Sequence, residues 1–150
     1  MVKGLLLAAS TLLFAGAAQA VLGGAEASVQ ADQIRFHGVH HESRNWQMAT
    51  HEIRLSDGSG IKQYVNAAGV VFAVSWRTRL KPDLAALLGT HASTSSAASV
   101  APSGIAAAKH QQSVRRADLV LHQFGRQNAF AGLAYVPSLV PAGVDADALR

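Results

Sequence analysis

The sequence contains no cysteine and few aromatic residues, which make up 6% of its 150 residues. Without a thiol the protein can form no disulfide and can use no cysteine nucleophile, and a lipid anchor has no cysteine to attach to. The fold must therefore rest on the burial of apolar side chains alone. A chain of this length predicts one domain with one modest hydrophobic core.

Charged residues are also missing near the beginning of the chain after Lys3, where a long uncharged apolar stretch follows. This stretch ends at Ala18-Gln19-Ala20, which has the small-x-small pattern of a signal-peptidase cleavage site. The pattern predicts a secretory signal peptide over residues 1–20, cleaved near Ala20, with cleavage after Ala17 as the alternative. The stretch is too short for a membrane-spanning helix, which needs about 20 apolar residues. We therefore expect a periplasmic or secreted protein.

No second long apolar run follows, and the charge of the remaining chain is mild. Removal of residues 1–20 leaves twelve Lys and Arg against nine Asp and Glu. We expect no transmembrane segment in the mature chain. We also expect no binding to nucleic acid, because that function needs a dense basic stripe rather than a small net charge.

Three runs near the middle of the chain alternate in the way of half-buried strands, and each is rich in β-branched or aromatic residues. These runs are His51–Leu55, Ile61–Asn66 and Val70–Trp76. Gly-containing turns separate them at 57–60 and 66–69, where glycine readily adopts positive φ. The pattern predicts a three-stranded antiparallel meander.

The rest of residues 21–150 completes one predicted domain around this meander. Two further alternating runs predict strands over Leu119–Phe124 and Ala129–Val136. The sequence thus predicts an α+β fold with a single antiparallel sheet of about five strands, one or two helices on one face, and the order α-β-β-β-α-β-β. Helical spacing predicts the two helices over Val29–His37 and from Pro82 to Gly89.

Two segments carry too little apolar surface to predict an element. His37–Asn45 is polar and is predicted to form a loop. Ser93–Ser113 is rich in Ser and Ala, and its small side chains bury too little area to offset the entropy of ordering. We predict a mobile loop there, with a helix over 105–112 as the alternative.

Four groups of residues in 21–150 form a recognisable set of motifs. They are His51-Glu52-Ile53, Tyr64-Val65 with Ala68–Val74 and Trp76, Pro82-Asp83-Leu84 with Leu87-Leu88-Gly89, and Gly132 with Ala134–Pro137, Leu139 and Pro141–Val144. Together they resemble the small exported bacterial proteins known as domain of unknown function 2844, over nearly all of residues 21–150. The resemblance implies export from a Gram-negative cell, and it implies no activity and no catalytic or ligand residue. The chain departs from the family pattern at Ser93–Ser113, where the resemblance implies a more apolar continuation of the preceding helix.

The one cluster of histidines is a candidate metal site. His37, His40 and His41 lie close together in the sequence, and Glu42 follows as a further possible ligand. On a continuous helix two of the imidazoles would share one side and could bind Zn²⁺ or Cu²⁺. Gly38 interrupts such a helix. The alternative interpretation is a solvated polar loop.

Three cations follow the central strand region and are a candidate contact for an anionic partner. Arg77, Arg79 and Lys81 alternate, so an extended backbone would place them on one face. Phospholipid headgroups or lipopolysaccharide would supply the matching charge. The alternative, which the sequence favours, is that these charges protect a sheet edge from pairing with other chains.

The sequence contains none of the following catalytic motifs in complete form. His41-Glu42 and His51-Glu52 begin like a zinc-protease motif, but the fifth positions are Asn45 and Leu55. There is no Gly-x-Ser-x-Gly and no phosphate-binding glycine motif. We therefore expect a non-enzymatic binding or interaction module of the cell envelope, without a cofactor and with its partner and oligomeric state left open. The alternatives are a periplasmic metal-binding protein using the histidine cluster, and a small hydrolase whose site one sequence does not reveal.

Overall fold

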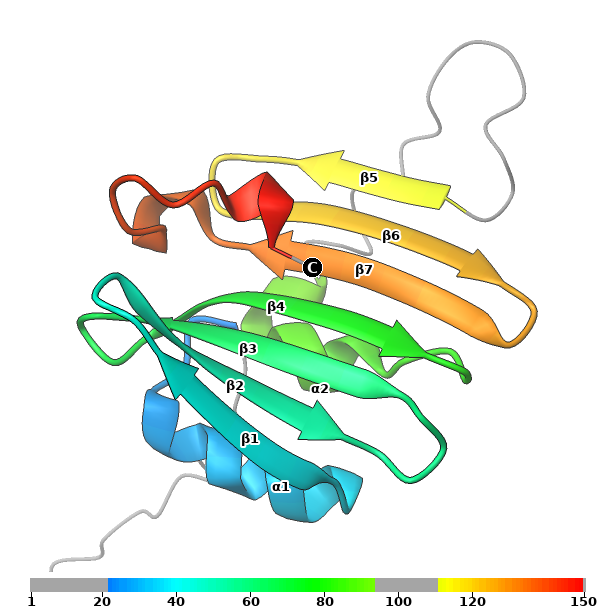
Figure 1. Ribbon diagram of the computed structural model, residues 1–150. Coiled ribbons are helices and arrows are strands. Elements are labelled where there is room, and N and C mark those ends of the chain that lie inside the picture. The colour runs from blue at the N-terminus through cyan, green and yellow to red at the C-terminus, as the bar shows by residue number, and fades with distance from the viewer. Residues whose placement is uncertain (1–21, 94–110, 150) are drawn as a thin grey trace, which may run out of the picture.

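Seven strands of the described residues pair antiparallel in one sheet with the spatial order β1-β2-β3-β4-β7-β6-β5 (Figure 1). The structure is a computed structural model that describes residues 22–93 and 111–149. The strands are β1 (Val39–Arg44), β2 (Met48–Arg54), β3 (Gly60–Asn66), β4 (Val71–Thr78), β5 (Gln111–Arg115), β6 (Val120–Arg126) and β7 (Ala129–Tyr135). The helices are α1 (Val29–Phe36) and α2 (Leu84–Leu88), with 3-10 turns η1 (Glu26–Ser28), η2 (Gly89–His91), η3 (Pro137–Leu139) and η4 (Ala146–Ala148).

The predicted sheet of about five strands in the order α-β-β-β-α-β-β is wrong, because the sheet has two more strands, one at each edge. Strand β1 occupies most of the segment predicted as a polar loop and pairs with β2 from Val39↔Arg54 to Arg44↔Ala49. Nearly all of its side chains are exposed, so it shows no apolar alternation. Backbone pairing, together with polar side chains that suit a free edge, accounts for the strand.

Strand β5, at the opposite edge, was also not predicted, because its side chains are mostly exposed and show no apolar alternation. It pairs with β6, and Val114 is its one buried residue. Its first three residues, 111–113, fall within the segment predicted to be a mobile loop. The remainder of that segment after Ser93 lies outside the described residues, and so does the predicted signal peptide over residues 1–20.

The five alternating runs correspond to β2, β3, β4, β6 and β7, with ends shifted by a few residues. The two predicted helices correspond to α1 and α2. Helix α2 begins at Leu84 rather than at Pro82, because Asp83 is its N-cap. The Asp83 carboxylate accepts hydrogen bonds from the N–H groups of Ala85 and Ala86, at 3.0 and 3.2 Å. None of the described helices has the length and apolar character that a membrane crossing requires.

The two faces of the sheet are covered differently. On one face, Phe36 of α1 and Leu87 of α2 join a buried cluster with Val74 and Trp76 of β4. On the other face, residues 137–149 cover a second cluster at one end of the sheet, in front of β6 and β7 in Figure 1. The rest of this second face is left open, and a groove lies there.

Candidate functional site

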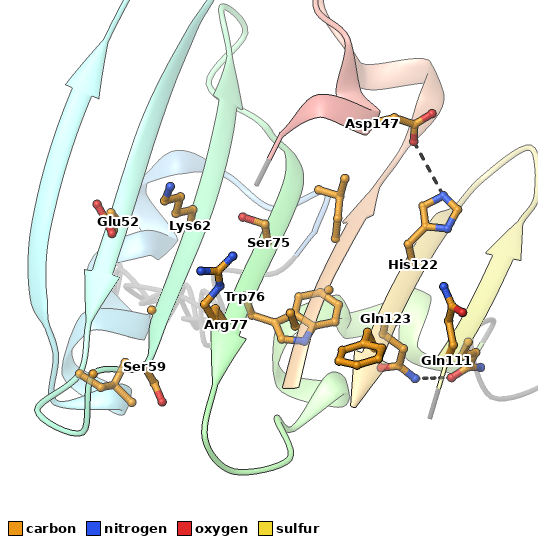
Figure 2. Close-up of a pocket in the computed structure, with 18 of the residues that line it drawn as sticks. Glu52, Ser59, Lys62, Ser75, Trp76, Arg77, Gln111, His122, Gln123 and Asp147 are labelled. Carbon is orange, nitrogen blue, oxygen red and sulfur yellow. Dashed lines mark hydrogen bonds and ion pairs between the residues drawn. The ribbon is translucent and has the colours of Figure 1, made fainter. Parts of the chain in front are cut away.

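A groove of about 1100 Å³ lies on the open face of the sheet. Strands from both halves of the sheet line it, and η4 contributes Asp147. Figure 2 shows Asp147 pointing toward His122 at one side, while Lys62, Ser75 and Arg77 stand on the neighbouring strands β3 and β4. Its polar side chains include Glu52, Arg54, Lys62, Ser75, Arg77, Ser113, His122 and Asp147.

The strand register explains why these side chains meet. Residues directly opposite each other on antiparallel strands share a face. One row therefore crosses the sheet as Glu52, Lys62, Ser75, Leu133, His122 and Ser113. The next row runs as Arg54, Gly60, Arg77, Ala131, Phe124 and Gln111. The groove floor is thus mostly polar and cationic near β3 and β4, and more apolar near β6 and β7.

Both carboxylates of the groove are already satisfied by neighbours. Glu52 accepts hydrogen bonds from Arg54 at 2.9 and 3.2 Å, and these bonds lower the pKa of Glu52. Asp147 accepts a hydrogen bond from the Tyr135 hydroxyl at 2.9 Å, which lowers the pKa of Asp147, and Arg115 lies 3.4 Å from it. Both groups are therefore ionised at neutral pH and bound within the protein.

Arg77 differs from the other charged groups of the groove. Its side chain is exposed, and its guanidinium makes no hydrogen bond or ion pair with any residue in 22–93 or 111–149. Lys62 stands next to it across the β3–β4 pairing, opposite Ser75. Arg77 is therefore the group of the groove best placed to bind an external anion.

A serine, a histidine and an aspartate also come together in this groove. Ser113 Oγ lies 2.9 Å from His122 Nδ1, and His122 Nε2 lies 3.8 Å from an Asp147 oxygen. Such a set can in principle activate a hydroxyl nucleophile. The histidine–aspartate separation exceeds a hydrogen bond, and all three side chains are substantially exposed to water.

Sequence reasoning missed this trio because its members come from three separate elements. The alternation of β6 does place His122 on the same face as Val120 and Phe124. Ser113 belongs to a strand with no visible alternation, and Asp147 lies in the C-terminal segment. Their convergence depends on strand pairing between distant segments, for which the chain carries no local signal.

The three predicted cations do not line one cavity. Arg77 lines the groove, and Lys81 lines a second cavity of about 290 Å³ beside Pro82 and Leu84. Arg79 lies in the bend after β4, where its backbone N–H donates to Ser59 Oγ at 3.1 Å. A joint cationic patch for an anionic partner therefore stays a prediction, and the groove contains one of its three members.

The three predicted histidine ligands do not share one face of one element. His37 ends α1 in the left-handed conformation, with φ of 50°. His40 and His41 are neighbours on β1, so their side chains lie on opposite faces of the sheet. His40 Nε2 lies 3.0 Å from His51 Nδ1, whereas His41 stands opposite Glu52 on the groove face. Metal binding by this trio stays a prediction, and the structure brings His40 together with a different set.

Comparison with curated proteins and with solved structures finds no match. A family model described as a protein of unknown function, DUF2844, matches residues 18–149. This match covers nearly the whole chain and confirms the resemblance seen in its motifs. The chain therefore belongs to the DUF2844 family of proteins of unknown function.

Proposed function

We propose that the protein is an exported, non-enzymatic binding module of the cell envelope, and that its groove binds an amphiphilic anion. The observation that carries this proposal is the exposed Arg77 guanidinium, which has no partner among the described residues and lies on the floor of a groove of about 1100 Å³. Arginine donates to phosphate or carboxylate through two parallel hydrogen bonds, so it gives both affinity and orientation.

The apolar half of the groove supports a ligand that also carries a hydrocarbon portion. Leu133, Ala131 and Phe124 line the part of the groove over β6 and β7. Phe124 is 40% exposed, and the Arg126 guanidinium lies 5.2 Å from the centre of its ring. Binding sites commonly combine an apolar wall with a few oriented polar groups, which is the combination found here.

Export is part of the proposal and has its own test. The composition of residues 1–20 supports cleavage near Ala20 and a periplasmic or secreted product. Expression of the full chain in a Gram-negative host, followed by fractionation and mass measurement, should yield a product that begins at Val21 outside the cytoplasm. A full-length product confined to the cytoplasm would contradict export and leave the groove proposal standing.

Ligand titration tests the groove. We expect dodecyl phosphate to shift the backbone amide NMR signals of β3, β4 and β7, and neutral dodecyl maltoside to bind more weakly. Arg77→Gln should weaken dodecyl phosphate binding about tenfold, because a hydrogen bond to a charged group contributes about 1.5 kcal/mol or more. Arg79→Gln, which keeps the same charge change outside the groove lining, is the matched control and should bind normally. Equal affinity for both detergents, or equal loss in both variants, would rule the proposal out.

A second candidate function is ester hydrolysis through Ser113 and His122, favoured by the 2.9 Å contact between their side chains. In this function the imidazole would take the hydroxyl proton as Ser113 attacks the ester carbonyl, and would return it to the departing alcohol as the ester C–O bond breaks. Water would then hydrolyse the acyl-serine and restore the hydroxyl. The test is hydrolysis of p-nitrophenyl acetate by the wild type, Ser113→Ala and His122→Asn. Activity that survives in Ser113→Ala would exclude this function. Because Ser113→Ala leaves Arg77 in place, its binding of dodecyl phosphate should be unchanged.

A further inference from the structure

A second group of chemically active side chains lies on the helix-covered side of the sheet, near the β1 edge. His51 Nε2 is 3.1 Å from Glu26 Oε1, and His51 Nδ1 is 3.0 Å from His40 Nε2. Ligand atoms of Glu26, Glu42 and His51 all lie within 4.8 Å of one another. None of these residues lines the groove.

The local fold holds this group in place. Glu42 stands directly opposite His51 in the β1–β2 pairing, so both side chains share one face. Glu26 begins η1, and its backbone N–H donates to Gly69 O at 2.9 Å, which fixes η1 against the turn after β3. The donors therefore come from an edge strand, its neighbour and an anchored 3-10 turn, rather than from one flexible segment.

Burial and ring stacking further restrict the central histidine. His51 is 4% exposed, whereas Glu26 and Glu42 keep part of their carboxylates open to solvent. The rings of His40 and His51 are stacked, with centroids 5.2 Å apart and planes 8° apart. The arrangement is a buried nitrogen donor with two oxygen donors at its accessible side.

We propose that Glu26, Glu42 and His51 bind a divalent transition-metal ion of the Zn²⁺ type, and that His40 positions His51. Nitrogen and carboxylate oxygen donors suit this ion, and three protein ligands leave one position for water. Zn²⁺ bonds of about 2.1 Å place neighbouring ligand atoms roughly 3.4 Å apart, which is close to the present Glu26–His51 contact of 3.1 Å. The Glu42 carboxylate lies within 4.8 Å of the other two ligand atoms and must move closer to them to complete the site.

The role of His40 follows from the two nitrogens of His51. With Nε2 on the metal, the Nδ1–H group of His51 donates to His40 Nε2, which fixes the tautomer and the ring orientation. A partner of this kind typically changes metal affinity by about 10-fold to 100-fold when it is removed. His40 is thus a positioning residue and not a ligand.

Arg44 competes with the metal ion for the same oxygen atoms. Its guanidinium hydrogen-bonds to Glu26 and also to Glu42, the second at 2.9 Å. The Arg44 side chain is 55% exposed, so it can turn into solvent when a metal ion arrives. A metal site therefore requires that removal of Arg44 strengthen metal binding, whereas a purely structural ion-pair network requires no such gain.

Titration calorimetry of the folded protein with ZnCl₂ tests the proposal. We expect one Zn²⁺ per chain and no binding of Ca²⁺, which prefers six or more oxygen ligands. Glu26→Gln and His40→Phe should each weaken Zn²⁺ binding about tenfold or more, and Arg44→Gln should strengthen it several-fold. His122→Asn and His37→Asn, which remove histidines elsewhere, should leave the affinity unchanged.

A second measurement on the wild type keeps the test decisive if a variant fails to fold. Paramagnetic Co²⁺ should broaden the backbone amide NMR signals of Glu42 and His51 before those of His122. Three outcomes overturn the proposal: an affinity that Glu26→Gln leaves unchanged, weaker binding in Arg44→Gln, or broadening centred on His122. The groove proposal rests on the other face of the sheet and survives each of them.

Discussion

At the scale of single residues, the most unusual group is a buried carboxyl on α1. Asp32 is 2% exposed, and its side chain accepts a hydrogen bond from Gln63 Nε2 at 2.7 Å. Burial is the largest influence on this group and raises the pKa of Asp32 to about 6. Gln63 Oε1 is also buried, and it has no hydrogen-bond partner among the described residues. The pair therefore costs stability whenever Asp32 is ionised.

The raised pKa of Asp32 determines how its contribution to the free energy of unfolding changes with pH. The folded state holds the Asp32 proton more tightly than the unfolded state, so the contribution of Asp32 to stability is fully present below about pH 4 and is lost as the pH rises through about 6. We predict that Asp32→Asn stabilises the protein at pH 7.5 by up to about 3 kcal/mol, since one pKa unit corresponds to about 1.4 kcal/mol.

Urea unfolding of both proteins at pH 4.0 and pH 7.5 measures this effect. The difference between Asp32→Asn and the wild type isolates Asp32 from other groups, such as Glu52, whose pKa is lowered and which act in the opposite direction. A gain at pH 7.5 that shrinks at pH 4.0 is expected. An Asp32→Asn protein that is less stable than the wild type at pH 7.5 would show that the carboxylate is stabilising.

At the scale of elements, the centre of the sheet depends on a contact between β4 and β7. Trp76 stands opposite Gly132, and a Cβ atom added at Gly132 would lie 2.2 Å from the Trp76 ring. We predict that Gly132→Ala destabilises the protein by about 2 kcal/mol or more, because overpacking typically costs 1–3 kcal/mol and this ring is confined by the cluster beneath the helices.

Thermal unfolding followed by circular dichroism checks this prediction against a matched glycine. A Cβ atom at Gly60, at the start of β3, meets nothing within 4 Å, so Gly60→Ala should leave the melting temperature nearly unchanged. Equal effects of the two substitutions would mean that the Trp76 ring moves freely and does not define the β4–β7 contact.

The two edge strands depend on polarity rather than on burial. In β1, His41 and Ser43 lie on the face away from the helices, opposite Glu52 and Thr50. Polar side chains at a sheet edge oppose pairing with another chain. We predict that the double variant His41→Val, Ser43→Val forms dimers or larger aggregates, which size-exclusion chromatography would detect. The control is Thr50→Val on β2, whose backbone is paired on both sides. This variant should elute at the same volume as the wild type.

The difference between buried inner strands and exposed edge strands explains which strands could be predicted from the sequence. Strands β2, β3, β4, β6 and β7 show apolar alternation because at least one face of each is buried, and the pattern located all of them. Strands β1 and β5 bury almost nothing, so no local pattern marks them. The groove could not be predicted from the sequence, because β7 lies between β4 and β6 and long-range pairing sets that order.

The two sites show the same limit in different ways. Alternation predicts that His122 and Arg77 lie on strand faces, but it does not say which residues face them. The histidine cluster was predicted from closeness in sequence, whereas the structure joins His40 to His51, eleven residues away, across a strand pair. Local spacing therefore indicates which side chains are available, and tertiary pairing decides which of them meet.

At the scale of the whole molecule, residues 137–149 cover one end of the groove face. Leu139, Val140, Val144 and Leu149 pack on a cluster that contains Phe72 and Tyr135. Polar contacts add to this packing: Asn66 Nδ2 donates to Leu139 O at 3.1 Å, and the Tyr135 hydroxyl donates to Asp147 at 2.9 Å. The segment therefore takes the place that helices hold on the opposite face.

Two truncations test whether this covering is needed for stability. A chain that ends at Val136 exposes the cluster around Phe72, and we predict a loss of about 3 kcal/mol or more, because fully burying one aliphatic side chain contributes about 1.5–3 kcal/mol. A chain that ends at Asp145 keeps Leu139 and Val144 and should lose less. Urea unfolding and binding of an apolar dye measure both effects. If the chain that ends at Val136 keeps the wild-type midpoint and binds no dye, residues 137–149 do not contribute to the core, and the groove would then extend over the whole face.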